Sequence, residues 1–138
     1  MNIQRGNTQG LLFQFGSGYV QPPLDATSYF AGASGLVNTT GSYSRIVIPR
    51  AGTVTRIDLD MVTYGAGSNE SSSIYFRLNN TTDTLITSAL DNSTALVNAS
   101  ASVSIAVAVG DYFEIKWVAP TWATDPTYVV YFGSVYME

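Results

Sequence analysis

Two carboxylate-bearing stretches contain the residues whose types and spacing could do chemistry. Asp58 and Asp60 lie two positions apart in TVTRIDLDMVTYG (53–65), and Glu114 and Lys116 lie two positions apart in YFEIKWVA (112–119). On one face of an extended strand this spacing puts two side chains about 7 Å apart, within the range of carboxylate separations that glycoside hydrolases use. Lysine chemistry would instead need a nucleophile such as serine beside a desolvated amine.

A plainer interpretation explains both pairs as charges on strand faces. Arg56 shares the face of Asp58 and Asp60, as expected for an open face, and no nucleophile motif accompanies Lys116. A cation site at the two aspartates would need about six to eight oxygen ligands. We therefore predict a non-enzymatic protein with no metal and no cofactor. A small polysaccharide hydrolase that uses Asp58 and Asp60 stays as an alternative.

Composition argues against several further classes of site. The 138 residues include no Cys and no His, which removes disulfides, thiol nucleophiles, His–Cys zinc sites and His-based catalytic triads. Six basic against ten acidic residues give a net charge of −4, so neither nucleic acid nor a membrane is an expected partner. Charged residues are only 12% of the chain, and such a neutral surface favours a secreted, cell-surface or virion protein.

The loop PTWATDP (120–126) offers a candidate ligand contact. Its Trp122 could stack on a sugar ring while Thr124 and Asp125 bind the sugar hydroxyls. The same tryptophan could equally close the end of the fold or meet a neighbouring subunit. Ligand contact and packing therefore both remain open for this loop.

The elements that must position these residues are strands. Alternation of apolar and polar residues is clear in 53–65, 73–79, 102–109 and 112–119, and no stretch keeps a helical period over ten residues. The pair Gly110-Asp111 predicts a tight turn between two strands. About eight short antiparallel strands predict an all-β fold, an antiparallel jelly-roll β-sandwich. The predicted strands occupy 27–32, 42–49, 53–65, 73–79, 84–90, 102–109, 112–119 and 127–138.

Residues 1–28 differ from the rest and predict an extended N-terminal arm, with the jelly-roll domain over 29–138. This segment is rich in Gly and Gln, carries Pro22-Pro23 and shows no steady period. Its apolar patch is too short for a core of its own, so we expect it to anchor the protein to a larger particle or to a neighbouring subunit. The predicted anchoring residues are Leu11, Leu12, Phe13 and Phe15.

The last strand, 127–138, is apolar on both faces. Tyr128, Val130 and Phe132 lie on one face, and the opposite face is equally apolar. A lone sandwich would expose one of these faces, whereas a homo-oligomer would bury it. We predict a homotrimer with Tyr128, Val130 and Phe132 in the trimer interface.

The order of motifs resembles the trimeric jelly rolls of the complement globular head and tumour necrosis factor superfamily. A Pro-x-x-Gly turn (49–52) precedes a long strand, a Gly-Asp turn (110–111) precedes an aromatic strand, and YFGSVYME (131–138) closes the chain. The stretches YFRLNNTTDTLIT and VGDYFEIKWVAPTWATDPTYVVYFGSVY are similar to domains of small tailed-phage virion proteins, in tail fibres or on heads. The resemblance implies a trimeric protein on the exterior of a virion, with other virion proteins as partners.

The sequence thus predicts a non-enzymatic structural protein of a phage virion, an exterior trimeric decoration or fibre-like protein held by its N-terminal arm. The alternative is a receptor-binding or carbohydrate-binding module that attaches the particle to a host-surface glycan. The hydrolase described above is the third possibility.

Overall fold

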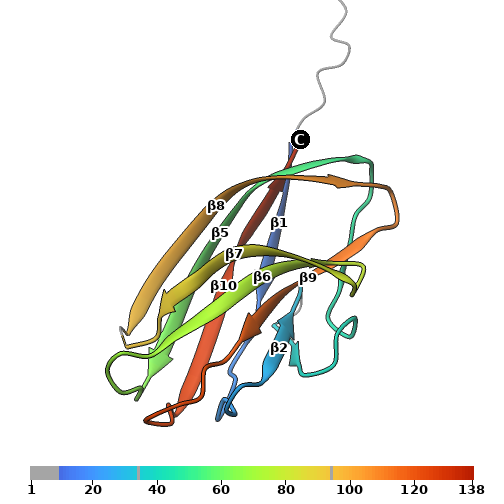
Figure 1. Cartoon of the computed structure of the whole chain (residues 1–138). Coiled ribbons are helices and arrows are strands. Elements are labelled where there is room, and N and C mark those ends of the chain that lie inside the picture. Colours follow the sequence, from blue (N-terminus) through green and yellow to red (C-terminus); the bar gives the residue numbers. More distant parts are fainter. Residues whose placement is uncertain (1–9, 34, 94) are drawn as a thin grey trace, which may run out of the picture.

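The protein is a sandwich of two antiparallel β-sheets, seen in a computed structural model that describes residues 10–33, 35–93 and 95–138 (Figure 1). None of the described residues forms a helix, and so none forms a helix that could span a membrane. The ten strands are β1 (Leu11–Gly16), β2 (Ser28–Ala31), β3 (Val37–Asn38), β4 (Ile46–Val47), β5 (Gly52–Tyr64), β6 (Ser71–Leu78), β7 (Thr82–Asp91), β8 (Leu96–Val107), β9 (Tyr112–Val118) and β10 (Tyr128–Met137).

The strand order is that of a jelly roll. Sheet A has the order β1-β10-β5-β8, and sheet B has the order β3-β2-β9-β6-β7, with the short β4 also paired to β9. When the two-residue strands β3 and β4 are set aside, the chain passes repeatedly from one sheet to the other. Its first strand, β1, and its last strand, β10, are neighbours in sheet A. This arrangement confirms the predicted all-β jelly-roll sandwich.

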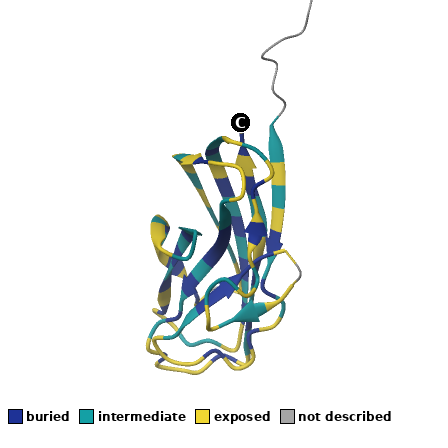
Figure 2. Cartoon of the chain, turned by 90° about the vertical axis from the view of Figure 1, so that its right-hand side faces the viewer, coloured by how far each residue is buried: buried dark blue, intermediate teal, exposed yellow. Residues whose placement is uncertain are grey.

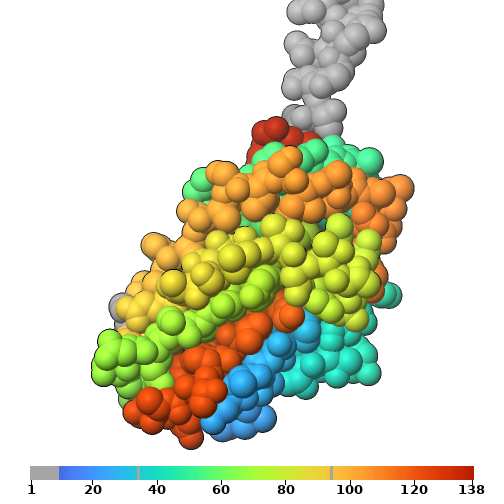
Figure 3. Space-filling model, in the orientation of Figure 1, coloured from blue at the N-terminus to red at the C-terminus, as the bar shows by residue number. Residues whose placement is uncertain are grey.

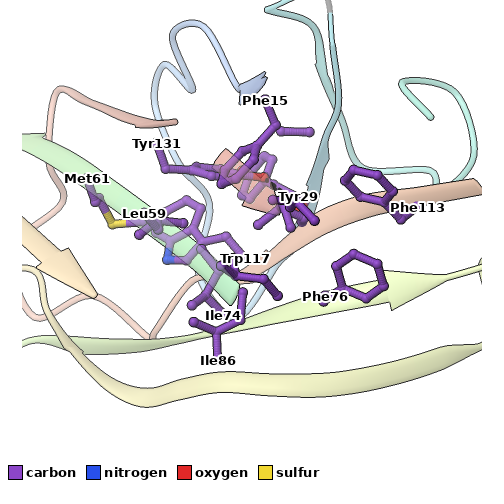
Figure 4. Close-up of a cluster of buried hydrophobic side chains, with 14 of the residues drawn as sticks. Phe15, Tyr29, Leu59, Met61, Ile74, Phe76, Ile86, Phe113, Trp117 and Tyr131 are labelled. Carbon is purple, nitrogen blue, oxygen red and sulfur yellow. Dashed lines mark hydrogen bonds between the residues drawn. The ribbon is translucent and has the colours of Figure 1, made fainter. Parts of the chain in front are cut away.

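The alternation of the sequence decides which side chains enter the core. On β5, Ile57, Leu59 and Met61 are fully buried between the sheets, while Arg56 and the two aspartates point outward. Sheet B supplies the opposing layer from β6 and β9. Figure 2 shows the dark-blue buried segments between the two layers, and Figure 4 shows the aromatic centre of this cluster. The largest fully buried side chains there are Trp117, Tyr131, Phe76 and Phe113.

The structure differs from the predicted extended arm. Residues 11–16 form β1, the edge strand of sheet A, and pair antiparallel with β10 from Leu11 opposite Met137 to Gly16 opposite Phe132. Phe15 is buried, and Leu11 and Phe13 pack against the core. The backbone ladder and the shared core remove the need for a separate hydrophobic core, so residues 10–28 belong to the same sandwich as the rest. The remainder of the predicted arm, residues 1–9, lies outside the described residues.

Tyr131 ties the two sheets together from β10. Its hydroxyl crosses the core and donates to the carbonyl oxygens of Tyr29, at 3.2 Å, and Ile115, at 3.1 Å, both in sheet B. Burial holds the pKa of the Tyr131 hydroxyl well above its usual range, and the charge of Glu114 raises that pKa further. The neutral hydroxyl is therefore the form that the fold requires.

This burial predicts a pH dependence. Above pH 10 an unfolded Tyr131 loses its proton while the folded one keeps it, so the native protein loses stability as pH rises toward the folded pKa. We expect Tyr131→Phe to lower the free energy of unfolding at pH 7 by about 0.5–1.5 kcal/mol and to make its decline above pH 10 shallower. Urea unfolding from pH 7 to 11 measures both effects. Tyr43→Phe, at an exposed position, is the control, and equal slopes for the two variants would contradict the argument.

The Gly110-Asp111 turn lies where the sequence predicts it, between β8 and β9. Gly110 has φ of +87°, and the Asp111 carboxylate accepts the Ala108 N–H at 2.8 Å. Asn79 also donates to this carboxylate, at 3.0 Å. These two hydrogen bonds hold the pKa of Asp111 below its usual range. The turn is thus fixed by backbone geometry and by one carboxylate.

Gly110→Val is expected to lower the free energy of unfolding by about 1–3 kcal/mol, because a β-branched residue resists positive φ. A Cβ at this position would meet no atom within 4 Å, so the loss reflects the backbone alone. Gly110→Asn is the matched control, since asparagine tolerates the left-handed region. Thermal melts of both variants test this, and an unchanged melting temperature for the valine variant would rule it out.

Candidate interaction surface

The outer face of sheet A gathers the exposed apolar side chains of four strands. We define this face by the outward-pointing residues that lie in register across β1, β10, β5 and β8. At one end it is aromatic and aliphatic, and toward the other end it is mostly polar, with Leu12 and Tyr136 beside Arg56. Its members are Leu12 and Gln14 on β1, Tyr128, Val130, Phe132, Ser134 and Tyr136 on β10, Arg56, Asp58, Asp60, Val62 and Tyr64 on β5, and Leu96, Asn98, Ser100 and Ser102 on β8.

The apolar end of this face is built from cross-strand pairs. Tyr128 lies opposite Tyr64, and the two rings stack with centroids 5.4 Å apart. Tyr19, in the loop after β1, packs edge-on against Tyr128 at 4.9 Å. The next row joins Val130, Val62 and Leu96 across three strands. Tyr19, Tyr64 and Leu96 are each at least 60% exposed, so the apolar end of the face lies open to water in the single chain.

The polar end contains the predicted carboxylate pair. Arg56 binds Asp58 at 2.9 Å, and both side chains are about half exposed. With Asp60, Asn98 and Ser100 they line a shallow hollow of about 300 Å³. Arg56 already engages Asp58, and the hollow is open to solvent, as on an ordinary charged strand face.

The outer face of sheet B has a different character, because its charges are paired. Asp83 accepts from Arg77 at 2.8 Å and from Lys116 at 2.9 Å. The Lys116 amine also lies over the Tyr75 ring, and the Arg77 guanidinium lies over the Phe30 ring. Partial burial acts to raise the pKa of Asp83, but the hydrogen bonds from Arg77 and Lys116 outweigh it and lower that pKa. Lys116 therefore pairs with Asp83 rather than with Glu114.

Glu114 is not the surface charge that strand alternation predicts. It points to the outer side of sheet B, but the segment between β3 and β4 covers it, and only 1% of the residue is exposed. Its carboxylate accepts the backbone N–H groups of Ser42, at 2.5 Å, and Ser44, at 3.0 Å. Glu114 thus holds a crossing loop against the sheet. Nothing in the local pattern indicates this, because the covering loop is remote in sequence.

Trp122 lies in the core, with 6% of the residue exposed. Its ring centre is 6.1 Å from that of Trp117, and its backbone N–H donates to the Asp25 carboxylate at 2.9 Å. Thr124 and Asp125 are exposed beside it. This placement corresponds to the packing alternative, since a sugar could not reach the face of the buried ring. The physical reason is that the Pro-bounded loop folds back over the open end of the sandwich.

Glu70 is a structural site that the sequence analysis missed. Its buried carboxylate accepts the backbone N–H groups of Gly67, at 3.1 Å, of Thr124, at 3.4 Å, and of Ala123. One side chain therefore joins the loop before β6 to the loop that carries Trp122. A single acid in a run of Ser, Gly and Asn gives no sign of this role.

The structure separates the other predicted site residues into two groups. Tyr128, Val130 and Phe132, the predicted trimer interface, all lie on the outer face of sheet A. Of the four predicted anchoring residues, Leu12 is exposed on that face, whereas Leu11, Phe13 and Phe15 point inward. Three of the four therefore stabilise this chain's own core and are not presented to a particle. Among the described residues no group of three or more His, Cys, Asp or Glu side chains could hold a metal ion.

Comparisons with known proteins leave the family open. No protein-family model and no curated protein matches the chain. Among solved structures, a family 35 carbohydrate-binding module from Clostridium thermocellum aligns with a TM-score of 0.32 and 8% identity over 90% of this chain and 98% of that one. A chain of Desmodium yellow mottle tymovirus aligns with a TM-score of 0.32 and 11% identity over 99% of this chain and 91% of that one. Likenesses this distant carry no argument about function.

Glu70 provides a test of how the loops are held. We expect Glu70→Gln to lower the free energy of unfolding by about 1–3 kcal/mol, because an amide NH₂ would face a backbone N–H that needs an acceptor. Asp125→Asn removes the same charge from an exposed position in the adjoining loop and should change stability by less than about 0.5 kcal/mol. Denaturant unfolding followed by tryptophan fluorescence measures both. Equal effects of the two variants would show that only net charge matters.

Proposed function

We propose that the chain is a non-enzymatic structural protein of a phage virion, an exterior component that assembles as a homotrimer through the outer face of sheet A. The observation that supports this most directly is the apolar row of Tyr19, Tyr64, Tyr128, Val130 and Leu96 on that face. Phe132, the next outward residue after Val130 on β10, is also exposed and extends the apolar surface along that strand.

The free energy of burying apolar side chains favours an interface that covers these residues. Each large apolar side chain that passes from water into an interface contributes about 1.5–3 kcal/mol when it becomes fully buried. Monomeric proteins rarely leave extended apolar patches in water, and aromatic residues are enriched where chains meet. The ring contacts among Tyr19, Tyr64 and Tyr128 already order these side chains in the single chain, which reduces the conformational freedom lost when a neighbour covers them.

A second copy is a better occupant of this face than a sugar. A sugar ring stacks on an open aromatic face, and the stack of Tyr64 on Tyr128, with an interplanar angle of 10°, already occupies one face of each ring. Trp122, the predicted sugar contact, is buried. The carbohydrate-binding alternative therefore has less support from the geometry than self-association has.

The virion assignment is supported by the sequence. Only 12% of the residues are charged, and the order of motifs resembles that of trimeric jelly rolls, including domains of tailed-phage virion proteins. The described part of the predicted arm is built into sheet A, so attachment to a particle would rest on exposed surfaces of the sandwich and on residues 1–9.

The test is the mass of the protein in solution. Light scattering should give a mass that is a whole multiple of three chains of 14.8 kDa, and Val130→Asp should remove this threefold association and leave a folded species of at most two chains, because a charge would be buried unpaired in the interface. Leu85→Asp, a matched change on the edge strand of sheet B, should leave the trimer intact. A monomeric native protein, or a trimer that survives Val130→Asp, would contradict the proposal.

A further inference from the structure

β8 leaves one side of its backbone open. It is the last strand of sheet A, paired to β5 on one side, and within the described residues no strand pairs with its other side. Figure 1 shows β8 along the outer margin of the sandwich, and Figure 3 shows it at the surface above β7. A strand of twelve residues in this position presents a long row of backbone groups that another strand could pair with.

β8 has few of the devices by which edge strands avoid such pairing, and its one irregularity is a register shift against β5 between Ser102 and Ile105. Its sequence, LVNASASVSIAV, contains no charged residue, no proline and no glycine. The other edge strands of the described chain are protected, because β7 carries Asp83 and Asp91, β1 has only six residues and β3 has only two. The long uncharged edge is therefore confined to one strand.

The inner face of β8 is incompletely covered. Five of the six residues that it turns toward the core are only half buried, and Val107 at its end is buried, whereas neighbours on β5 such as Ile57 and Leu59 are at most 2% exposed. The sandwich thus thins toward this margin, and a further strand would cover both the backbone and these side chains. The half-buried residues are Val97, Ala99, Ala101, Val103 and Ile105.

We infer that β8 pairs antiparallel with β8 of a second copy, so that two four-stranded sheets A join into one continuous sheet. In such an antiparallel pair the twofold axis would pass through Ala101 or Ser102, near the middle of the strand. Each inward residue of one copy then lies opposite an inward residue of the other, and each outward residue, including the serines, lies opposite an outward residue. The opposing side chains are then all uncharged and, apart from Asn98, small or aliphatic, so the strand complements itself.

Repulsion between the carboxylates of the two sheets A does not oppose the pairing of β8 with β8. The nearest carboxylates of sheet A, Asp58 and Asp60, lie on β5 rather than on β8. Across the joined sheet, the two β5 strands would be three strand spacings apart, about 14 Å. That distance exceeds the Debye length of about 8 Å at physiological salt. This contact uses an edge, and so it is separate from the association through the outer face proposed above.

Cysteine cross-linking tests the inference directly, because the chain has no cysteine of its own. Ala101→Cys and Ser102→Cys each put one thiol at a possible symmetry axis. Opposed residues of an antiparallel pair have Cα atoms about 4.5–5.5 Å apart, which suits a disulfide. After mild oxidation of the full chain, one of the two variants should shift from 14.8 kDa to twice that mass on a non-reducing denaturing gel. Ala89→Cys, exposed on β7, is the matched control and should stay at the single-chain mass.

Two results would overturn the inference. The first is that neither variant cross-links more than Ala89→Cys does. The second is that the cross-link forms but disappears when Val130→Asp is added, because the contact would then arise from the outer face rather than from the edge. Retention of the cross-link in the Val130→Asp background is the expected result. If the protein does not form a trimer, the β8–β8 cross-link is still expected. The experiment therefore separates pairing through the edge from association through the outer face of sheet A.

Discussion

The packing of Trp117 and Tyr131 between the sheets is the interaction on which the rest of the structure depends. Their rings lie 6.0 Å apart, and the Tyr131 hydroxyl reaches two carbonyl groups of the opposite sheet. Trp117 in turn donates to Ser72 at 2.7 Å and stacks on Tyr29. These contacts fix the spacing and register of the two layers. Because side chains alternate along a strand, fixing which residues of β10 point inward also decides which ones point outward.

The outward-pointing residues of the two sheets differ in how far their charges and apolar side chains find partners within the chain. Sheet B pairs its charges around Asp83 and covers Glu114 with a loop, so these charged groups are satisfied within one chain. Sheet A leaves a row of tyrosines and aliphatic residues open on its face and leaves β8 unpaired at its margin. Apolar exposure and an unprotected edge both lose free energy in water. The features that favour association therefore gather on sheet A.

Local alternation was enough to predict much of the fold from the sequence. It located β5, β6, β9 and β10 and the Gly110-Asp111 turn, and with them the jelly-roll class. It missed β1, because adjacent Leu11 and Leu12 interrupt the alternation and glycines surround the strand. Contacts between segments that are distant in the sequence could not be predicted from these local patterns. Glu114 is buried by a loop some 70 residues away and Trp122 is held from residue 25, and no local pattern encodes either contact.

Sheet A has two exposed surfaces, its outer face and the unpaired side of β8, and they point in perpendicular directions. Its outer face points along the normal of the sheet, whereas the free side of β8 points within the sheet, along the hydrogen-bonding direction. A contact through the face stacks one sandwich on another, and a contact through the edge extends the sheet. The first uses side chains and the second uses backbone groups, so neither occupies what the other needs. A chain with two such independent surfaces can be linked to more than one neighbour at once, which a component of an assembled particle requires and a freely diffusing monomer does not.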